Sequence, residues 1–268
     1  MVGGWVVALL AVAAAQGQGQ GVELGSAARA PGPGDVAHSH NDYEQPEPLQ
    51  QALRAGFRSV EADVWWRGGE IVVSHSMFTA RGRLEDLYLR PLQARVDALG
   101  SVLGDGRPFY LWIDLKQSSR ELTEALHRTL MRYRMIRAFD DDGASSGPVV
   151  VVLTGDEDAK RRYVEEHVLR FACRDSNELG PADAPSDGRW SWYALAWGDV
   201  LGDGPSSASG PAALQRLRAV VARVHRLGRR LRMYRVPDRI DAWAIAVAAG
   251  ADLVSTDHIE AFRDYLEA

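Results

Sequence analysis

Short apolar segments alternate with helical segments along most of this chain, and this alternation restricts its fold more than any other feature. Eight segments have the length and the apolar, β-branched or aromatic content typical of buried strands. They are residues 36–40, 59–64, 109–116, 148–155, 170–175, 191–197, 231–236 and 251–256. Helical patterns lie between them, at residues 47–55, 120–138, 157–167, 212–227, 239–249 and 259–266.

Eight strands with intervening helices in roughly 230 to 250 residues predict an α/β fold, a (β/α)8 TIM barrel. A doubly wound open sheet is the alternative. Residues 71–75, which follow a turn at residues 67–69, predict a hairpin arm after the second strand. Residues 181–188 and 202–210 are rich in Pro, Gly and Ser and are predicted to be loops.

The first 35 residues are predicted to lie outside the barrel. Residues 5–15 form an apolar run of signal-peptide length, and Ala13 and Ala15 provide a small-x-small cleavage pattern. We expect a signal peptide in residues 1–20, a linker in residues 21–35 and a single barrel domain in residues 36–268. The protein is then exported, to the periplasm or out of the cell, unless the leader stays uncleaved and anchors it in the membrane.

Charge and cysteine content exclude several classes of function. Lys and Arg number 31 against 36 Asp and Glu, so the formal net charge is −5. A mildly acidic chain lacks the basic field of a general nucleic-acid binder. Cys173 is the only cysteine of the sequence, which excludes an intramolecular disulfide and any zinc site built from several cysteines.

Acidic side chains gather at the carboxyl ends of the second and third predicted strands. Glu61 and Asp63 are two residues apart, so both project to the same side of one strand, and Asp114 and Lys116 share a side of the next. In a barrel these strand ends form the active-site face. Three carboxylates repel one another unless a cation lies between them, and a divalent cation such as Mg²⁺ or Ca²⁺ suits such ligands.

Histidines flank this acidic group in the sequence. His38 and His40 end the first strand, and His75 ends the hairpin arm. Imidazole titrates near neutral pH, so one histidine can accept a proton while another donates one. Together with a cation and the ammonium of Lys116, an acid–base pair is consistent with phosphodiester cleavage.

The segment from Ala37 to His75 resembles the glycerophosphodiester phosphodiesterase family, part of the phospholipase C-like phosphodiesterase superfamily. The motifs are AHSHNDY, ALRAGFRSVEADV and EIVVSH, in the family's order and spacing. The HSHNDY form is similar to the branch called altered inheritance of mitochondria homologues. The H-x-x-N pattern of His38 and Asn41, and the D-L-K strand at Asp114, are similar to those of spider-venom sphingomyelinase D enzymes.

The resemblance implies roles for individual residues. Glu61, Asp63 and Asp114 would be the metal ligands, and Lys116 a phosphate contact. His38 and His75 would be the acid–base pair. The family's H-R-G is replaced here by His38-Ser39-His40, so its phosphate-contacting arginine is missing. His40 would fill that role or be the catalytic histidine itself.

These observations predict a metal-dependent phosphoric diester hydrolase. Its substrate would be a glycerophosphodiester, a phospholipid headgroup or a lysophospholipid-like molecule. For a lipid substrate, we also expect the protein to contact a membrane peripherally. Asn41 and Arg235 are further candidates for substrate binding, and one of Trp65 and Trp66 is a candidate lipid contact. The alternative is a non-catalytic barrel that binds a phosphorylated ligand or a lipid surface.

Overall fold

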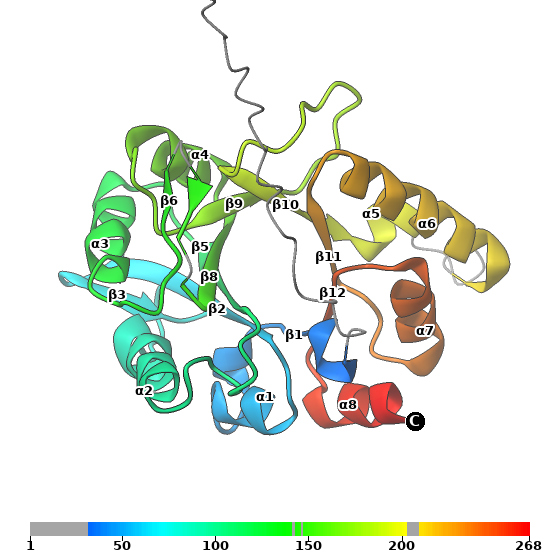
Figure 1. The fold of residues 1–268 in the computed structure, drawn as a ribbon, viewed down its shortest axis with the longest axis horizontal. Helices are drawn as coiled ribbons and strands as arrows, with labels where there is room; N and C mark the ends of the chain where they lie inside the picture. The colour runs from blue at the N-terminus through cyan, green and yellow to red at the C-terminus, as the bar shows by residue number, and fades with distance from the viewer. Residues whose placement is uncertain (1–31, 141–142, 146, 203–208) are drawn as a thin grey trace, which may run out of the picture. The chain divides into compact units, whose positions relative to one another are not determined.

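Eight parallel strands close into a barrel, and helices surround it (Figure 1). The computed structural model describes residues 32–140, 143–145, 147–202 and 209–268. The barrel strands are β1 (Ala37–Ser39), β2 (Ser59–Arg67), β5 (Phe109–Leu115), β8 (Val149–Gly155), β9 (Cys173–Ser176), β10 (Trp190–Ala196), β11 (Arg230–Tyr234) and β12 (Leu253–Thr256). Strand β1 pairs in parallel with both β12 and β2, which closes the sheet. The predicted (β/α)8 barrel is confirmed, and the open sheet is wrong.

All six predicted helical segments contain a helix. The helices are α1 (Gln50–Arg54), α2 (Arg90–Leu99), α3 (Arg120–Leu130), α4 (Glu157–Glu166), α5 (Trp197–Leu201), α6 (Gly210–Arg226), α7 (Ile240–Ala249) and α8 (Ile259–Glu267). Short helical turns lie at η1 (Pro33–Asp35), η2 (Asp42–Glu44) and η3 (Glu85–Leu89). The predicted signal peptide, residues 1–20, lies outside the described residues, as do residues 21–31 of the predicted linker.

The sequence prediction is wrong in three places outside the barrel strands. Helix α3 ends at Leu130 instead of residue 138, because Ile136 turns in to form a bridge with Val149 at the start of β8. Helix α2 was not predicted. Helix α5 was not predicted either. The loop predicted at residues 181–188 is confirmed, because residues 177–189, all of them described, contain no helix or strand.

Two apolar clusters lie on opposite sides of the barrel wall. Phe109, Leu111 and Ile113 of β5 pack in the large outer cluster with helix residues such as Leu122. Tyr110 and Trp112 belong instead to a separate cluster that contains strand residues only. Since side chains alternate along a strand, the even-numbered residues of β5 face the barrel interior.

The predicted hairpin arm is present and extends β2 beyond the barrel. Strand β3 (Glu70–Val73) pairs antiparallel with β2, and β4 (Gly82–Arg83) pairs with β3. Strands β6 (Phe139–Asp140) and β7 (Gly143–Ala144) form a separate antiparallel pair. None of the described helices is long and apolar enough to cross a bilayer.

Gly155, the last residue of β8, provides a test of the barrel's packing. Its φ of +87° is in the left-handed region, and a Cβ there would overlap Oδ1 of Asp114 and the backbone of Leu115. We expect Gly155→Ala to lower the free energy of unfolding by about 2–4 kcal/mol, from backbone strain plus the clash. Urea unfolding followed by circular dichroism measures this loss.

Gly188→Ala is the matched control. Gly188 has a φ of +82° but no atom near the position of a Cβ, so its substitution adds backbone strain alone, about 1–2 kcal/mol. Equal losses for the two variants would show that close packing behind Asp114 contributes nothing.

Candidate active site at the carboxyl end of the barrel

Glu61, Asp63 and Asp114 form an acidic cluster at one end of the barrel. One carboxylate oxygen from each lies within 4.8 Å of the others. Strand geometry explains the convergence: Val60, Ala62 and Val64 pack in the outer cluster, so Glu61 and Asp63 point inward. Asp63 is aligned with Asp114 in the parallel pairing of β2 and β5. The structure therefore brings together the three residues that the sequence predicted as metal ligands.

Two cations partly compensate the negative charge of the acidic cluster. Lys116 Nζ lies 2.8 Å from Asp63 Oδ2 and 2.8 Å from Asp114 Oδ2. Arg232 of β11 donates from Nη2 to Glu61 Oε1 at 2.9 Å. Burial raises the pKa of Asp114 to about 6 although Lys116 opposes it. Burial raises the pKa of Glu61, but Arg232, His38 and His40 together outweigh burial and hold this pKa well below its usual value.

One oxygen of each carboxylate in the acidic cluster has no hydrogen-bond partner among the described residues. These atoms are Glu61 Oε2, Asp63 Oδ1 and Asp114 Oδ1, all of them buried. Buried polar atoms are nearly always satisfied in folded proteins, so this arrangement points to a bound group. Three carboxylate oxygens are hard anionic donors, and a divalent cation such as Mg²⁺ or Ca²⁺ fits them better than zinc does.

His38 is fully buried beneath the acidic cluster. Its Nδ1 shares a hydrogen bond of 2.7 Å with Ser59 Oγ, and its Nε2 lies 3.6 Å from Glu61 Oε2. The ring packs edge-on against Trp112, with 5.7 Å between the ring centroids. Burial, reinforced by Arg232, lowers the pKa of His38 to about 3. This histidine is therefore neutral at physiological pH.

His40 lies at the rim of the barrel and is partly open to solvent. Its Nε2 lies 3.8 Å from Glu61 Oε2, and its Nδ1 is 2.8 Å from Asp257 Oδ1. The imidazole side chain is 36% exposed. Burial opposes its protonation, yet the hydrogen bond to Asp257 and the charge of Glu61 together raise the pKa of His40. Asp257 follows β12 and was not predicted as a site residue.

His75 reaches the acidic cluster from the hairpin arm. Its side chain is 65% exposed, and its Nδ1 lies 3.4 Å from Asp63 Oδ2. The Tyr43 hydroxyl donates to Asp63 Oδ2 at 2.9 Å and lies 3.3 Å from His75 Nδ1. It also lies 3.2 Å from Oδ1 of Asn41. Asn41 has a φ of +44°, a left-handed conformation that asparagine tolerates. The structure thus places His75 and Asn41 beside Asp63.

Arg232 is, after Asp257, a second site residue that sequence reasoning missed. It faces the interior because its neighbours Leu231 and Met233 pack in the outer cluster. Its guanidinium lies over the Trp112 ring, 4.5 Å from the centroid, and its Nε and Nη1 are buried without hydrogen-bond partners among the described residues. A signal was present in the sequence: a charged residue stands between two apolar ones in a predicted buried strand.

Arg235 lies apart from the acidic cluster. It follows β11, has a φ of +51° and is exposed. Its guanidinium lies over the Tyr234 ring, 5.7 Å from the centroid. No contact between Arg235 and the cluster is present in the described part of the chain, so nothing in the geometry supports its predicted place in the substrate site.

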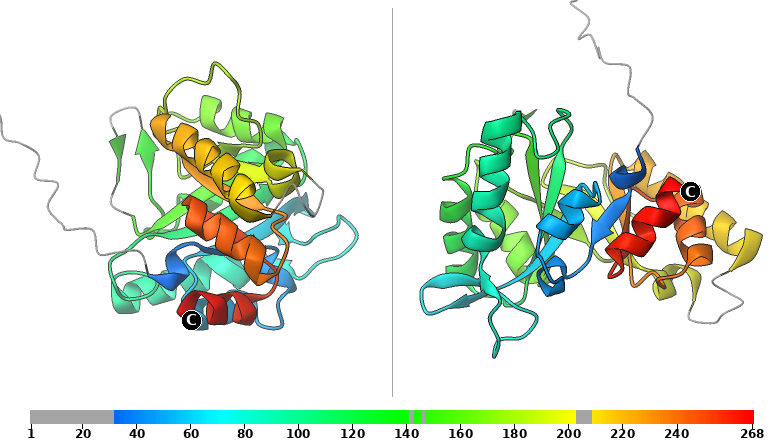
Figure 2. Two further views of the ribbon diagram at one scale, coloured as in Figure 1. Left: turned by 90° about the vertical axis from the view of Figure 1, so that its right-hand side faces the viewer. Right: turned by 90° about the horizontal axis from the view of Figure 1, so that it is seen from below.

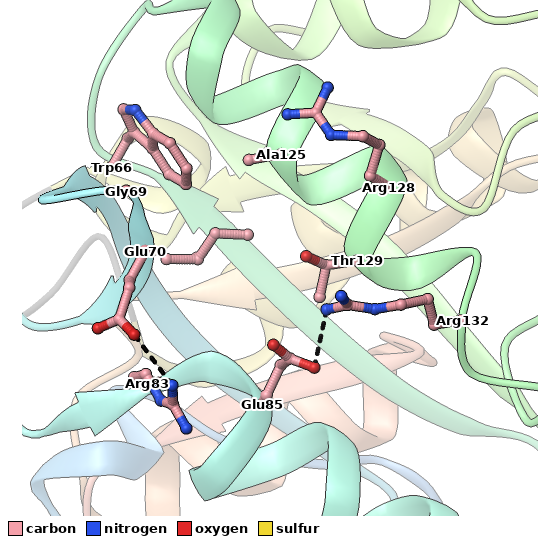
Figure 3. A pocket seen from close by; sticks show the side chains of 10 residues that line it. Trp66, Gly69, Glu70, Arg83, Glu85, Ala125, Arg128, Thr129 and Arg132 are labelled. Carbon is pink, nitrogen blue, oxygen red and sulfur yellow. Dashed lines mark hydrogen bonds and ion pairs between the residues drawn. The ribbon is translucent and has the colours of Figure 1, made fainter.

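A separate hollow of about 350 Å³ lies outside the barrel, between the hairpin arm and α3 (Figure 3). Trp66 forms part of its wall. Its arginines are paired with carboxylates: Arg83 with Glu70 at 2.9 Å, and Arg132 with Glu85 at 2.9 Å. No residue of the acidic cluster lines it, so the two features are distinct.

Comparisons with known proteins point to one family. Residues 33–102 match the family model described as an AIM6-like phosphodiesterase domain. The chain is 34% identical over 143 residues to Altered inheritance of mitochondria protein 6 of Lachancea thermotolerans, which covers 44% of this chain and 33% of that protein. The protein of the same name from Eremothecium gossypii is 28% identical over 267 residues, with 85% of this chain and 68% of that protein covered.

One solved structure supports the fold. The crystal structure of glycerophosphodiester phosphodiesterase from Agrobacterium tumefaciens str. C58 superposes with a TM-score of 0.53 at 14% identity. The alignment covers 87% of this chain and 99% of that chain. These matches confirm the family resemblance predicted from the sequence, and the structural likeness shows the same barrel fold.

The Arg232–Glu61 ion pair gives a stability prediction. Arg232→Met leaves the buried Glu61 carboxylate without its cation, so we expect the free energy of unfolding to fall by about 3–5 kcal/mol. Adding Glu61→Gln removes the uncompensated charge, and the double variant is expected to recover most of that loss. Urea unfolding in EDTA at neutral pH measures both. A double variant no more stable than Arg232→Met alone would contradict this interpretation.

Proposed function

From the premise that this chain is a relative of the AIM6-like phosphodiesterases, we propose that it is a metal-dependent phosphoric diester hydrolase. One observation carries the proposal: Glu61, Asp63 and Asp114 each bring a carboxylate oxygen within 4.8 Å of the others, and each keeps one buried oxygen without a hydrogen-bond partner among the described residues. They lie at the strand ends where barrel enzymes hold their active sites. Two cationic side chains and two solvent-accessible histidines surround them.

Glu61, Asp63 and Asp114 would hold the divalent cation, Mg²⁺ or Ca²⁺. When bound, such a cation neutralises phosphate oxygens and the charge that develops on them in the transition state. Tyr43 and Lys116 both contact Asp63 Oδ2, which leaves Oδ1 as the free donor. These contacts fix the orientation of the Asp63 carboxylate.

Arg232 and Lys116 would bind the phosphate of the substrate. Arg232 has two buried nitrogen atoms, Nε and Nη1, that form no hydrogen bond with any residue that the structure describes. Guanidinium N–H groups match phosphate oxygens well. We assign to Arg232, on β11, the phosphate contact that the replaced H-R-G segment lacks on β1. This assignment removes the need for His40 to serve as the phosphate contact.

His40 and His75 would act as the acid–base pair. Both side chains are open to a substrate at the rim, whereas His38 is fully enclosed. Asp257 orients His40 through Nδ1 and leaves Nε2 directed toward the acidic cluster. One histidine would take a proton from a substrate hydroxyl or from water, and the other would protonate the departing oxygen. His38 would position Glu61 from below.

The substrate would be a small phosphodiester of the glycerophosphodiester or phospholipid-headgroup class. The partly exposed rim, with Lys116 and His40 both accessible, suits a headgroup that enters from solvent. Attack by a neighbouring substrate hydroxyl, which yields a cyclic phosphate, is the route that the family resemblance suggests.

Metal dependence is tested on the full chain with bis-(p-nitrophenyl) phosphate and a panel of glycerophosphodiesters. We expect turnover with Mg²⁺ or Ca²⁺ and none in EDTA. Asp114→Asn removes one charged ligand at nearly constant volume, so we expect metal affinity to fall about tenfold or more, together with kcat. Calorimetric titration of the cation and initial rates measure the two effects.

Asp241→Asn is the control for the metal experiment. Asp241 is an exposed carboxylate on α7, paired with Arg239 at 2.9 Å, and its substitution is expected to change neither quantity. Cation binding without turnover on any diester would instead support the non-catalytic barrel that binds a phosphorylated ligand.

The histidine assignment makes a separate prediction. His40→Ala and His75→Ala are each expected to lower kcat by about 10²–10⁴-fold, since each removes one proton-transfer group. Asp257→Asn is expected to lower kcat less, because His40 stays in place but is oriented less well. If His40→Ala retained the kcat of the unsubstituted chain, His38 would instead be the catalytic histidine.

A further inference from the structure

The loop between β3 and β4 presents two neighbouring apolar side chains to solvent. Met77 is 52% exposed and Phe78 is 87% exposed; we call this pair the apolar tip. Phe78 is the most exposed large apolar residue in the described part of the chain. Figure 2 shows the loop projecting from the barrel on the hairpin arm. Adjacent exposed apolar side chains, unlike apolar residues scattered singly over a surface, make this loop a candidate contact surface.

Hydrogen bonds hold the apolar tip in a defined conformation. Arg67 Nη1 donates to the carbonyl oxygens of Met77, at 2.7 Å, and of Thr79, at 2.6 Å. The Ser74 hydroxyl bonds the Ser76 carbonyl at 2.8 Å and also contacts the Thr79 hydroxyl. These hydrogen bonds hold the backbone of the loop, so the backbone loses little conformational freedom when the tip binds a surface.

Positive charge accompanies the apolar tip. Arg67 is bonded to carbonyl groups and not to a carboxylate. Arg81 is exposed and forms no ion pair with any residue that the structure describes. A projecting apolar tip flanked by uncompensated arginines complements a membrane that carries anionic lipids.

The apolar tip is joined directly to the proposed active site. Ser74 N donates to the Asp63 carbonyl at 3.0 Å. The loop therefore starts beside Asp63, a residue of the acidic cluster. His75 comes next, with Nδ1 at 3.4 Å from Asp63 Oδ2, and the tip follows two residues later. A surface that receives Phe78 would therefore lie beside the opening to the site.

We propose that the apolar tip inserts into an anionic lipid surface, so that the site acts on headgroups of lipids held in a bilayer or micelle. This inference rests on the proposed function and narrows its substrate class from free glycerophosphodiesters to aggregated lipid. Trp65 and Trp66 are half-buried: Trp65 donates to the Ser74 carbonyl at 2.9 Å, and Trp66 packs on the core. They support the arm, and Met77 and Phe78 make the contact.

Vesicle co-sedimentation of the full chain tests the contact. The probes are phosphatidylcholine vesicles with and without phosphatidylglycerol. We expect binding to the anionic vesicles that weakens as salt rises. Phe78→Ser is expected to weaken this binding about tenfold, since it removes most of a buried phenyl group's transfer free energy. Arg81→Gln is expected to weaken it about fivefold, and only on anionic vesicles.

Val168→Ser is the matched control. Val168 is 74% exposed and lies between α4 and β9, a connection that enters the barrel at the end opposite the acidic cluster. Its substitution is expected to leave vesicle binding unchanged. Equal vesicle binding by Phe78→Ser and the unsubstituted chain would overturn the proposal. So would self-association that depends on Phe78 without vesicle binding, because the tip would then join two copies of the chain.

Rates on two substrates separate this inference from the proposed function. The ratio of turnover on vesicle lipid to turnover on bis-(p-nitrophenyl) phosphate is expected to fall in Phe78→Ser and to stay constant in Val168→Ser. An unchanged ratio in an active enzyme overturns the lipid-surface proposal alone. Absence of turnover on every diester, with vesicle binding that depends on Phe78, overturns the proposed hydrolase and supports the surface contact.

Discussion

The site depends on the neutralisation of three carboxylates that the barrel buries together. Lys116 lies between Asp63 and Asp114, and Arg232 crosses the barrel interior from β11 to reach Glu61 on β2. Buried ion pairs are weak contributors to stability, and apolar replacements are often as good or better. A core built for stability alone would not need these charges. Their presence, together with carboxylate oxygens and guanidinium nitrogens that lack hydrogen-bond partners in the described part of the chain, supports the proposal that this site binds a ligand.

The barrel places these groups through the two-residue period of its strands. On β2 the even-numbered Val60 and Ala62 pack outward, and on β11 the odd-numbered Leu231 and Met233 do the same. The intervening Glu61 and Arg232 must then point inward, where they meet at 2.9 Å. A slip of one residue in either strand would exchange the two sets and bury apolar side chains in the site. The outer core therefore specifies the geometry of the inner polar groups.

This period explains what sequence reasoning could and could not predict. Glu61 and Asp63 lie on β2, and Asp114 lies on the neighbouring strand β5. The alternation of side chains along each strand was therefore sufficient to predict that the three carboxylates lie together. The Arg232–Glu61 contact joins residues 171 positions apart on strands that are not neighbours, and it depends on the closure of the barrel. Asp257 reaches His40 across 217 positions for the same reason. His38 was predicted to be the catalytic histidine because it aligns with a family motif. The structure distinguishes the two histidines by burial, since His38 is fully buried and His40 is partly exposed.

The hairpin arm connects the proposed active-site residues to the proposed lipid contact. One segment of chain carries Glu61 and Asp63, turns at the end of β2, returns to His75 and ends in the apolar tip. Val64 pairs with Val73, so His75 comes back to the height of Asp63. All four residues of β3 pair with residues 64–67 of β2, and only His75 and Ser76 separate Ser74 from the tip, so a large shift of the tip would move His75. Insertion of Phe78 into a bilayer would hold the arm, and with it His75, at a constant height above the lipid headgroups.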